Sequence, residues 1–143
     1  MLQQIYPSVQ HPYAFELNKD FNFSSAHYIP YEEAGKCHNV HGHTYFINLT
    51  IAGDELDKMG FLVNFSELKS LIHKRYDHRL LNDFEEFKDN SPSTEQVAQT
   101  IYNIVQESLD NRDNKPKCVQ VFVRETPTSY VVYRPVKQGE NNA

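Results

Sequence analysis

The feature that most constrains the fold is a long alternation of apolar and polar residues near the start of the chain. Over residues 13–27 the apolar side chains are those of Phe15, Leu17, Phe21 and Phe23, and the polar ones between them are Glu16, Asn18, Asp20 and Asn22. A period of two is typical of a β-strand, because successive side chains of a strand point to opposite sides. The pattern predicts one long strand with one polar face.

Five more segments have patterns typical of secondary structure. Residues 43–52 are rich in β-branched and aromatic side chains, and 118–124 and 130–134 predict two strands joined by a turn at 126–128. Apolar residues recur at helical spacing over 65–76. A second amphipathic helix follows Pro92, where Ser93 and Gln96 form a candidate capping box, and its apolar stripe extends to Leu109.

The predicted order of elements is ββααββ. Two successive hairpins favour an antiparallel sheet, and two amphipathic helices can cover one face of it. We therefore expect an α+β fold in a single domain over 1–143, with an N-terminal arm over 1–12 and a flexible tail over 136–143. A four-stranded sheet leaves two edges, and unless these are blunted they favour self-association.

Charge and hydropathy exclude two classes of partner. The formal net charge of −5 argues against general binding to nucleic acid, which needs a clustered basic surface. The chain has no apolar run long enough to span a membrane. Its first residues lack the basic and apolar regions of a secretory signal, so we expect a cytoplasmic protein whose two cysteines, Cys37 and Cys118, are reduced.

Three histidines are placed where they can form a metal site. His41 and His43 are two residues apart, so on an extended strand both imidazoles point to the same side. His27 ends the preceding predicted strand, and the loop between them lets the second strand return beside it. Three protein ligands with one open position are typical of catalytic zinc. A lone histidine is more often structural, and His11 and His73 are interpreted in that way.

Cys37 lies in the same loop, four residues before His41. A thiol near a divalent metal and imidazoles loses its proton readily, and the thiolate can act as a base or nucleophile. The alternative is that Cys37 is a fourth zinc ligand, which would close the site and make it structural. The spacing alone does not separate these two hypotheses.

Two further features carry weaker signals for chemistry. Asp77 precedes His78, and a carboxylate beside an imidazole can form a proton shuttle; from the residues alone, an unrelated helix-end histidine is preferred. Glu125 ends a predicted strand, where its carboxylate can accept two hydrogen bonds from an amidine-like edge such as that of a pterin. It is equally consistent with an ordinary exposed turn residue.

Five motifs together resemble a known family. The segments FNFSSAH, CHNVHGH, DHRLLND, PSTE and VRETP occur in the order and approximate spacing of the 6-pyruvoyltetrahydropterin synthase and 6-carboxytetrahydropterin synthase family, over residues 15–134. The resemblance implies the tunnelling fold, in which trimers form an oligomeric barrel and usually stack as hexamers. It also implies a pterin substrate and active sites at subunit interfaces.

The resemblance implies roles for individual residues. His27, His41 and His43 match the zinc ligands of the family, Cys37 matches its proton-abstracting base, and the Asp77–His78 pair matches the groups that make the other proton transfers. Glu125 matches the glutamate that anchors the pterin ring. Ser93 and Thr94 fall in a segment that helps to hold the pterin through backbone and hydroxyl groups.

The spacing C-x-x-x-H-G-H resembles the bacterial 6-carboxytetrahydropterin synthases of queuosine biosynthesis. This implies that 7,8-dihydroneopterin triphosphate is converted to 6-carboxy-5,6,7,8-tetrahydropterin, with release of acetaldehyde and triphosphate. One alternative is the sister activity, elimination of triphosphate to give 6-pyruvoyltetrahydropterin. The other is a non-catalytic zinc- or pterin-binding module in which Cys37 closes the metal site.

Overall fold

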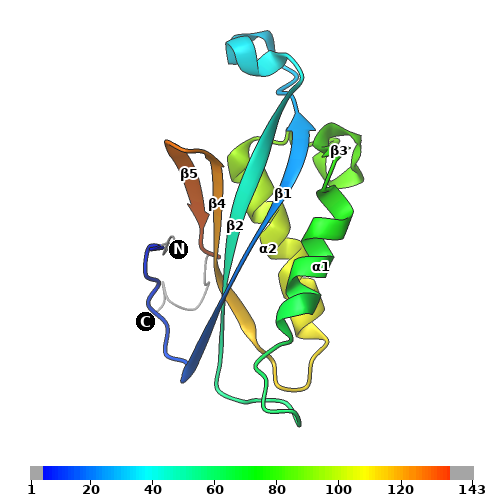
Figure 1. The fold of residues 1–143 in the computed structure, drawn as a ribbon. Coiled ribbons are helices and arrows are strands. Elements are labelled where there is room, and N and C mark those ends of the chain that lie inside the picture. The colour runs from blue at the N-terminus through cyan, green and yellow to red at the C-terminus, as the bar shows by residue number, and fades with distance from the viewer. Residues whose placement is uncertain (1–4, 136–143) are drawn as a thin grey trace.

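A computed structural model describes residues 5–135 as one five-stranded sheet with two helices against one of its faces (Figure 1). The strand order in the sheet is β3-β1-β2-β4-β5. The strands are β1 (Phe15–His27), β2 (His41–Gly53), β3 (Arg79–Leu80), β4 (Lys117–Thr126) and β5 (Ser129–Tyr133). The helices are α1 (Phe65–Tyr76) and α2 (Thr94–Asp110), with short 3₁₀ turns η1 (Glu32–His38), η2 (Leu81–Asp83) and η3 (Glu85–Phe87).

The centre of the sheet is the antiparallel pair of β1 and β2. Their register runs without interruption from Phe15 opposite Gly53 to His27 opposite His41. The predicted long strand over 13–27 is therefore confirmed, and β2 begins two residues earlier than the prediction of 43–52. Because His41 and His43 both lie inside β2, their side chains point to the same side of the sheet.

The hydrophobic core lies between this sheet and the two helices. Alternate residues of β2 turn inward and are almost fully buried, while α1 and α2 supply an apolar stripe each. Both predicted helices are confirmed, and Ser93 is the N-cap of α2 as its spacing to Gln96 indicates. Among residues 5–135, no helix is long and apolar enough to cross a membrane. The main core residues are Ile47, Leu49, Ile51, Leu68, Ile72, Val97, Ile101, Val105 and Leu109.

The opposite face of the sheet is polar and partly covered by the N-terminal segment. The side chains of Asn48, Thr50 and Gln120 lie on this face and are buried. Asn48 donates to the carboxylate of Asp20 (2.8 Å), and Gln120 donates to the carbonyl of Pro7 (2.8 Å). Residues 5–12 form no helix or strand, and Tyr6 and Pro7 among them contact this face. The predicted tail, 136–143, lies outside the described residues.

The predicted order ββααββ is wrong in one respect, because a fifth strand stands between the helices. β3 is only two residues long and pairs in parallel with β1, Arg79 opposite Ser25 and Leu80 opposite Ala26. Two residues cannot show a periodicity, so the hydrophobic pattern carried no signal for this strand. It makes the sheet mixed rather than purely antiparallel, and it fixes the residues just before it against the edge of β1.

Candidate active site

Three imidazoles converge where β1 ends and β2 begins. His27 is the last residue of β1, and the strand register places it directly opposite His41. The ring centroids lie 4.5 Å apart for His27 and His41, 5.1 Å for His27 and His43, and 4.9 Å for His41 and His43. One nitrogen from each ring lies within 4.8 Å of the others, which is the arrangement expected of three ligands around one metal ion.

Backbone carbonyls orient two of these rings. His27 donates from Nδ1 to the carbonyl of Pro92, just before α2 (2.6 Å), and His41 donates from Nδ1 to the carbonyl of Asn39 (2.7 Å). A carbonyl oxygen only accepts, so the proton of the neutral ring stays on Nδ1 and Nε2 keeps its lone pair. Second partners of this kind are a regular feature of metal-binding histidines.

Burial favours the neutral form of two of these imidazoles, which is the form that binds a metal ion. Desolvation lowers the pKa of His27, although its hydrogen bond to Pro92 opposes the shift, and desolvation likewise lowers the pKa of His43, against the attraction of Glu125. The Nε2 atoms of His27 and His43 are buried and have no hydrogen-bond partner among the described residues. Unpaired nitrogen lone pairs at this spacing fit zinc, for which neutral imidazole is a common ligand.

Glu125 faces the same point from β4. Its register neighbours Arg124 and Thr126 pair with Tyr130 and Ser129, so Glu125 is an extra residue that bulges out of the β4–β5 ladder. The bulge brings its carboxylate to 3.9 Å from Nε2 of His27 and 3.7 Å from Nε2 of His43. Glu125 therefore lies beside the three imidazoles and within reach of a ligand bound there.

The N-terminus of α2 positions this carboxylate. Thr94 donates its hydroxyl proton to Oε2 of Glu125. Ser93 caps the helix instead, because its hydroxyl accepts the backbone N–H of Gln96 (3.2 Å). An open hollow of about 460 Å³ adjoins Glu125 and is lined by His43, Thr44, Phe46, Arg124, Thr126 and Pro127. The structure thus joins Thr94 to Glu125 and uses the Ser93 side chain in the helix cap.

Asp77 and His78 form a hydrogen-bonded pair at the outer edge of β1. His78 donates from Nδ1 to Oδ2 of Asp77 (2.8 Å), and Oδ1 of Asp77 accepts the backbone N–H of Ser24 (2.8 Å). The hydrogen bond from Ser24 contributes most, and that from His78 next, to holding the pKa of Asp77 below its ordinary value. The carboxylate is therefore ionised and fixes which nitrogen of His78 carries the proton.

The backbone of His78 is in an unusual conformation. Its φ of 61° lies in the left-handed region, which costs a residue with a side chain about 1–2 kcal/mol. The backbone N–H of His78 donates to the carbonyl of Ser24 (2.6 Å), which holds this turn against β1. Strain of this kind concentrates at functional sites. The result is an imidazole with 83% of its side chain exposed, held beside the strand edge.

A second hollow adjoins this pair and includes one residue of the histidine cluster, His43. It measures about 510 Å³ and is lined by His78, Arg79, Ser24 and His43, among others. His43 and Thr44 also line the hollow beside Glu125. The two hollows therefore share two lining residues at the start of β2, and Glu125 borders one hollow while His78 borders the other.

Cys37 lies in η1, the loop that extends beyond the ends of β1 and β2 (Figure 1). The thiol is exposed, and the backbone carbonyl of Cys37 accepts the N–H of Ile29 (2.8 Å). Within the described part of the chain, the group of side chains arranged to hold a metal contains the three histidines and no sulfur. The structure therefore does not bring Cys37 into the histidine cluster, and among the described residues no hydrogen bond joins Cys37 to His78 within one chain.

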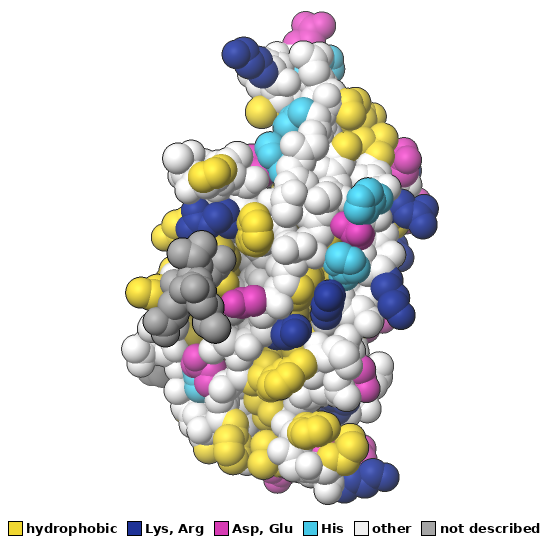
Figure 2. Space-filling view, in the orientation of Figure 1, with side chains coloured by type: hydrophobic (Ala, Val, Ile, Leu, Met, Phe, Trp, Pro, Cys, Tyr) yellow, Lys and Arg dark blue, Asp and Glu magenta, His cyan; other side chains and the backbone are white. Residues whose placement is uncertain are grey.

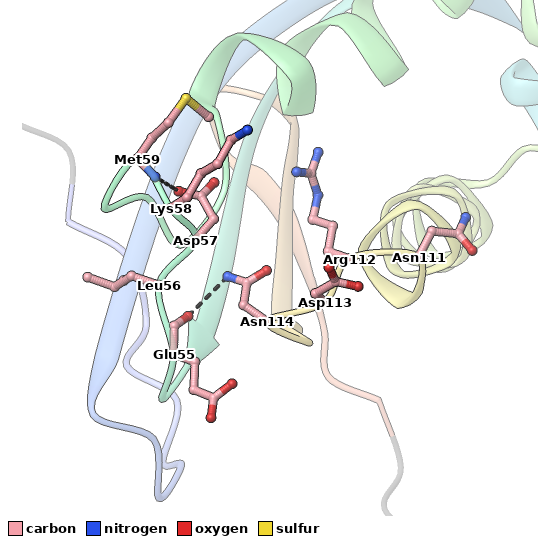
Figure 3. Close-up of a pocket in the computed structure, with 9 residues that line it drawn as sticks. All are labelled: Glu55, Leu56, Asp57, Lys58, Met59, Asn111, Arg112, Asp113 and Asn114. Carbon is pink, nitrogen blue, oxygen red and sulfur yellow. Dashed lines mark hydrogen bonds between the residues drawn. The ribbon is translucent and has the colours of Figure 1, made fainter.

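A separate hollow of about 600 Å³ lies at the far end of the molecule (Figure 3). It is formed by the loops after β2 and after α2, roughly 40 Å along β2 from His41. Its polar groups are used in shaping these loops: Oδ1 of Asp57 accepts the N–H groups of Met59 and Phe61, and Asn114 donates to the carbonyls of Glu55 and Leu62. The polar groups that line this hollow therefore serve to hold the loops in shape, and they form no cluster like that of the three histidines.

Comparison with known proteins shows which family this chain resembles. A family model described as 6-pyruvoyl tetrahydropterin synthase matches residues 16–136, which covers the helices and strands above except the first residue of β1. The chain belongs to this family. A solved member of the synthase family, 6-pyruvoyl tetrahydropterin synthase of Caenorhabditis elegans, superimposes with a TM-score of 0.71 at 26% identity, over 85% of this chain and 96% of that one.

Curated synthases include two informative relatives. The 6-carboxy-5,6,7,8-tetrahydropterin synthase of Bacillus subtilis (strain 168) is 65% identical, over 99% of both chains. The 6-pyruvoyl tetrahydrobiopterin synthase of Drosophila melanogaster is 33% identical, over 87% of this chain and 82% of that one. The similarity is thus much higher to this carboxy-forming synthase than to this pyruvoyl-forming one.

Proposed function

We propose that this chain is a 6-carboxy-5,6,7,8-tetrahydropterin synthase. It converts 7,8-dihydroneopterin triphosphate to 6-carboxy-5,6,7,8-tetrahydropterin with release of acetaldehyde and triphosphate, as a step of queuosine biosynthesis. The observation that carries the proposal is the convergence of His27, His41, His43 and Glu125 on one point, in a chain 65% identical to the Bacillus subtilis synthase. The enzyme acts as a zinc-dependent lyase in the cytoplasm.

The carboxylate of Glu125 recognises the pterin. A carboxylate accepts two parallel N–H donors well, and the amino-pyrimidine edge of a pterin presents such a pair. Thr94 and the bulge in β4 hold the carboxylate toward the histidines, and the adjoining hollow has room for a ring system. Ser93 contributes by fixing the start of α2, so that its role in binding is through the backbone.

His27, His41 and His43 hold zinc through the Nε2 atoms that point into the cluster. When bound, the metal supplies a Lewis acid that acidifies protons next to the oxygens of the substrate side chain. The carbonyls of Pro92 and Asn39 keep the rings of His27 and His41 in the tautomer that binds a metal.

Two groups move protons. Cys37 is exposed in η1, at the end of the sheet that holds the histidine cluster, and removes a proton as the thiolate. His78 exchanges a proton at Nε2, because its Nδ1 proton is committed to Asp77. The roles of Cys37 and His78 are compatible with a site in which one chain supplies the metal ligands and a neighbouring chain supplies one of the two proton-transfer groups.

Assembly as a trimer or hexamer supports the same function. The sheet ends in β3, of two residues, and β5, of five, and both edges can pair with another copy to form the oligomeric barrel. The polar face of the sheet would then line the interior. Sedimentation of the zinc-loaded protein tests this, and a monomer at catalytic concentrations would contradict assembly through the edges.

The decisive experiment is product analysis. Zinc-loaded protein is incubated with 7,8-dihydroneopterin triphosphate, and the products are identified by mass spectrometry beside the Cys37→Ala variant. We expect 6-carboxy-5,6,7,8-tetrahydropterin and acetaldehyde from the wild type only. A pyruvoyl product would assign the sister activity, and tight pterin binding with no product would assign a non-catalytic module; either outcome overturns the proposal.

A further inference from the structure

His73 makes a second contact with the carboxylate of the Asp77–His78 pair. It lies one turn before Asp77 on α1, and its Nε2 is 3.5 Å from Oδ2 of Asp77. The same oxygen accepts the Nδ1 proton of His78 at 2.8 Å. One carboxylate oxygen therefore has an imidazole on each side, and histidine and acidic side chains adjoin one another on the face shown in Figure 2.

The other nitrogen of His73 is already committed. Nδ1 donates to the backbone carbonyl of Asn22 on β1 (2.8 Å). Because a carbonyl oxygen only accepts, the Nδ1 position carries a proton, and the ring is fixed between a strand and a carboxylate. Its Nε2 attracts Asp77 when it also carries a proton, which makes the ring a cation beside an anion. After the larger effects of the hydrogen bonds from Ser24 and His78, the charges of His78 and His73 also lower the pKa of Asp77.

The two histidines differ in exposure in a way that separates their roles. The side chain of His73 is 33% exposed, donates a hydrogen bond from Nδ1 and has Nε2 within ion-pair distance of Asp77, whereas the side chain of His78 is 83% exposed and makes no hydrogen bond from Nε2 among the described residues. A ring fixed to β1 at Nδ1 and facing a carboxylate at Nε2 is suited to holding that carboxylate in place. A ring with one exposed nitrogen is suited to exchanging a proton.

We propose that His73 is a positioning residue for the proton-transfer pair. It holds Oδ2 of Asp77 where that oxygen accepts the Nδ1 proton of His78, and it thereby keeps Nε2 of His78 available to the substrate. This proposal rests on the proposed function for its catalytic consequence, but the arrangement of the three side chains is testable without turnover.

The test compares His73→Leu, which removes both ring nitrogens, with His73→Gln, which keeps one donor. We expect His73→Leu to lower kcat about tenfold with the KM for the pterin nearly unchanged, and His73→Gln to recover part of the loss. The matched control is His11→Leu. His11 also contacts a carboxylate, Glu16 (2.9 Å), but roughly 26 Å along β1 from Ser24, so its loss leaves kcat unchanged.

A double-mutant cycle with Asp77→Asn separates positioning from general destabilisation. If His73 acts through Asp77, His73→Leu lowers kcat in the wild type and has little further effect in Asp77→Asn. Equal losses in both backgrounds would mean that His73 acts by another route, and the proposal would be wrong.

Nitrogen-15 spectra of the histidine rings provide a readout independent of activity. In the zinc-loaded wild type we expect one tautomer of His78, protonated at Nδ1, and in His73→Leu a mixture of both tautomers. An unchanged His78 spectrum in His73→Leu would overturn the proposal even if kcat falls. A wild type that shows the expected spectra and no turnover would instead leave His73 in this role and remove the proposed function.

Discussion

The three clustered histidines differ in what holds them. His27 is buried and donates to the carbonyl before α2, and His41 donates to the carbonyl of Asn39 in the adjoining loop. His43 has no such bond among the described residues and lines two hollows. Removing any one ring leaves two nitrogens, which are too few for the three-ligand site typical of catalytic zinc. His41 is the best test case, because it is less buried than His27 and its loss disturbs the core least.

His41→Ala should therefore lose bound zinc and turnover while the protein stays folded. We expect zinc to fall from about one ion per chain to below about a tenth of that, as measured by elemental analysis after dialysis. The matched control is His38→Ala, whose ring contacts the carbonyl of Ile29 and lies outside the cluster. A His41→Ala protein that keeps both zinc and activity would contradict the ligand assignment.

Sequence reasoning could predict which residues form the cluster, but only part of how they are held. The two-residue spacing of His41 and His43 fixes their common side on any strand, so their convergence was accessible. The direction in which the Glu125 side chain points could not be predicted, because it depends on a bulge that only the pairing of β4 with β5 reveals. The tie between His27 and the carbonyl of Pro92 joins residues 65 positions apart and has no local signal.

At the level of elements, the start of α2 links stability to the site. Ser93 caps the helix, Thr94 holds Glu125, and the carbonyl of Pro92 holds His27, so three consecutive residues serve three different contacts. The capping signal at Ser93 was visible in the sequence, as was the apolar stripe that follows it. The short β3 and the left-handed His78 were not visible, because both arise from pairing with β1.

Ser93→Ala should destabilise the protein by about 1 kcal/mol, the usual cost of removing a helix N-cap. The free energy of unfolding is measured by urea titration monitored by circular dichroism. Ser108→Ala, in the last turns of the same helix, is the control and should leave stability nearly unchanged or raised. An equal loss for both variants would mean that the effect is not one of capping.

The end of α1 is clamped to η3 by a carboxylate. Glu86 accepts two hydrogen bonds from Arg75, from Nε and from an amino nitrogen (both 2.8 Å), and one from the hydroxyl of Tyr76. The hydrogen bonds from Arg75 contribute most to lowering the pKa of Glu86 from 4.5 to about 2. A carboxylate whose pKa is lower in the folded state stabilises the protein above its unfolded pKa, and that stability is lost as the pH falls toward 2.

Glu86→Gln should therefore cost about 1–2 kcal/mol at pH 7, and the difference from the wild type should shrink as the pH falls from about 4.5 toward 2. Urea titrations at pH 7, 4 and 3 measure the difference, with Glu85→Gln as the control, since Glu85 makes no ion pair among the described residues. A difference that is constant over this range would rule out the clamp as its source.

For the whole molecule, the histidine cluster ties together the strand pair at the centre of the sheet and the helix layer behind it. Two of its histidines lie in β2 and one in β1, and the ring of His27 donates to the segment before α2. An unfolded chain cannot offer these three nitrogens together. Zinc bound only to the folded state stabilises it in proportion to the logarithm of its concentration over its dissociation constant.

Removal of zinc by a chelator should lower the Tm by about 5–10 °C, if the metal is present at about a hundredfold over its dissociation constant. Differential scanning calorimetry with and without added zinc measures the shift. In His41→Ala the shift should vanish. A Tm that does not respond to zinc in the wild type would mean that the histidine cluster does not bind it in the folded state.

The loop hollow in Figure 3 has a practical consequence for anyone building reagents from this protein. Thiol-reactive dyes would attach to the exposed Cys37 and not to the buried Cys118, and so would modify the residue proposed as the base. Lys58, exposed in the loop after β2, is separated from the histidines by the length of β2. A fluorophore or affinity handle introduced there reports on the protein while leaving its chemistry untouched.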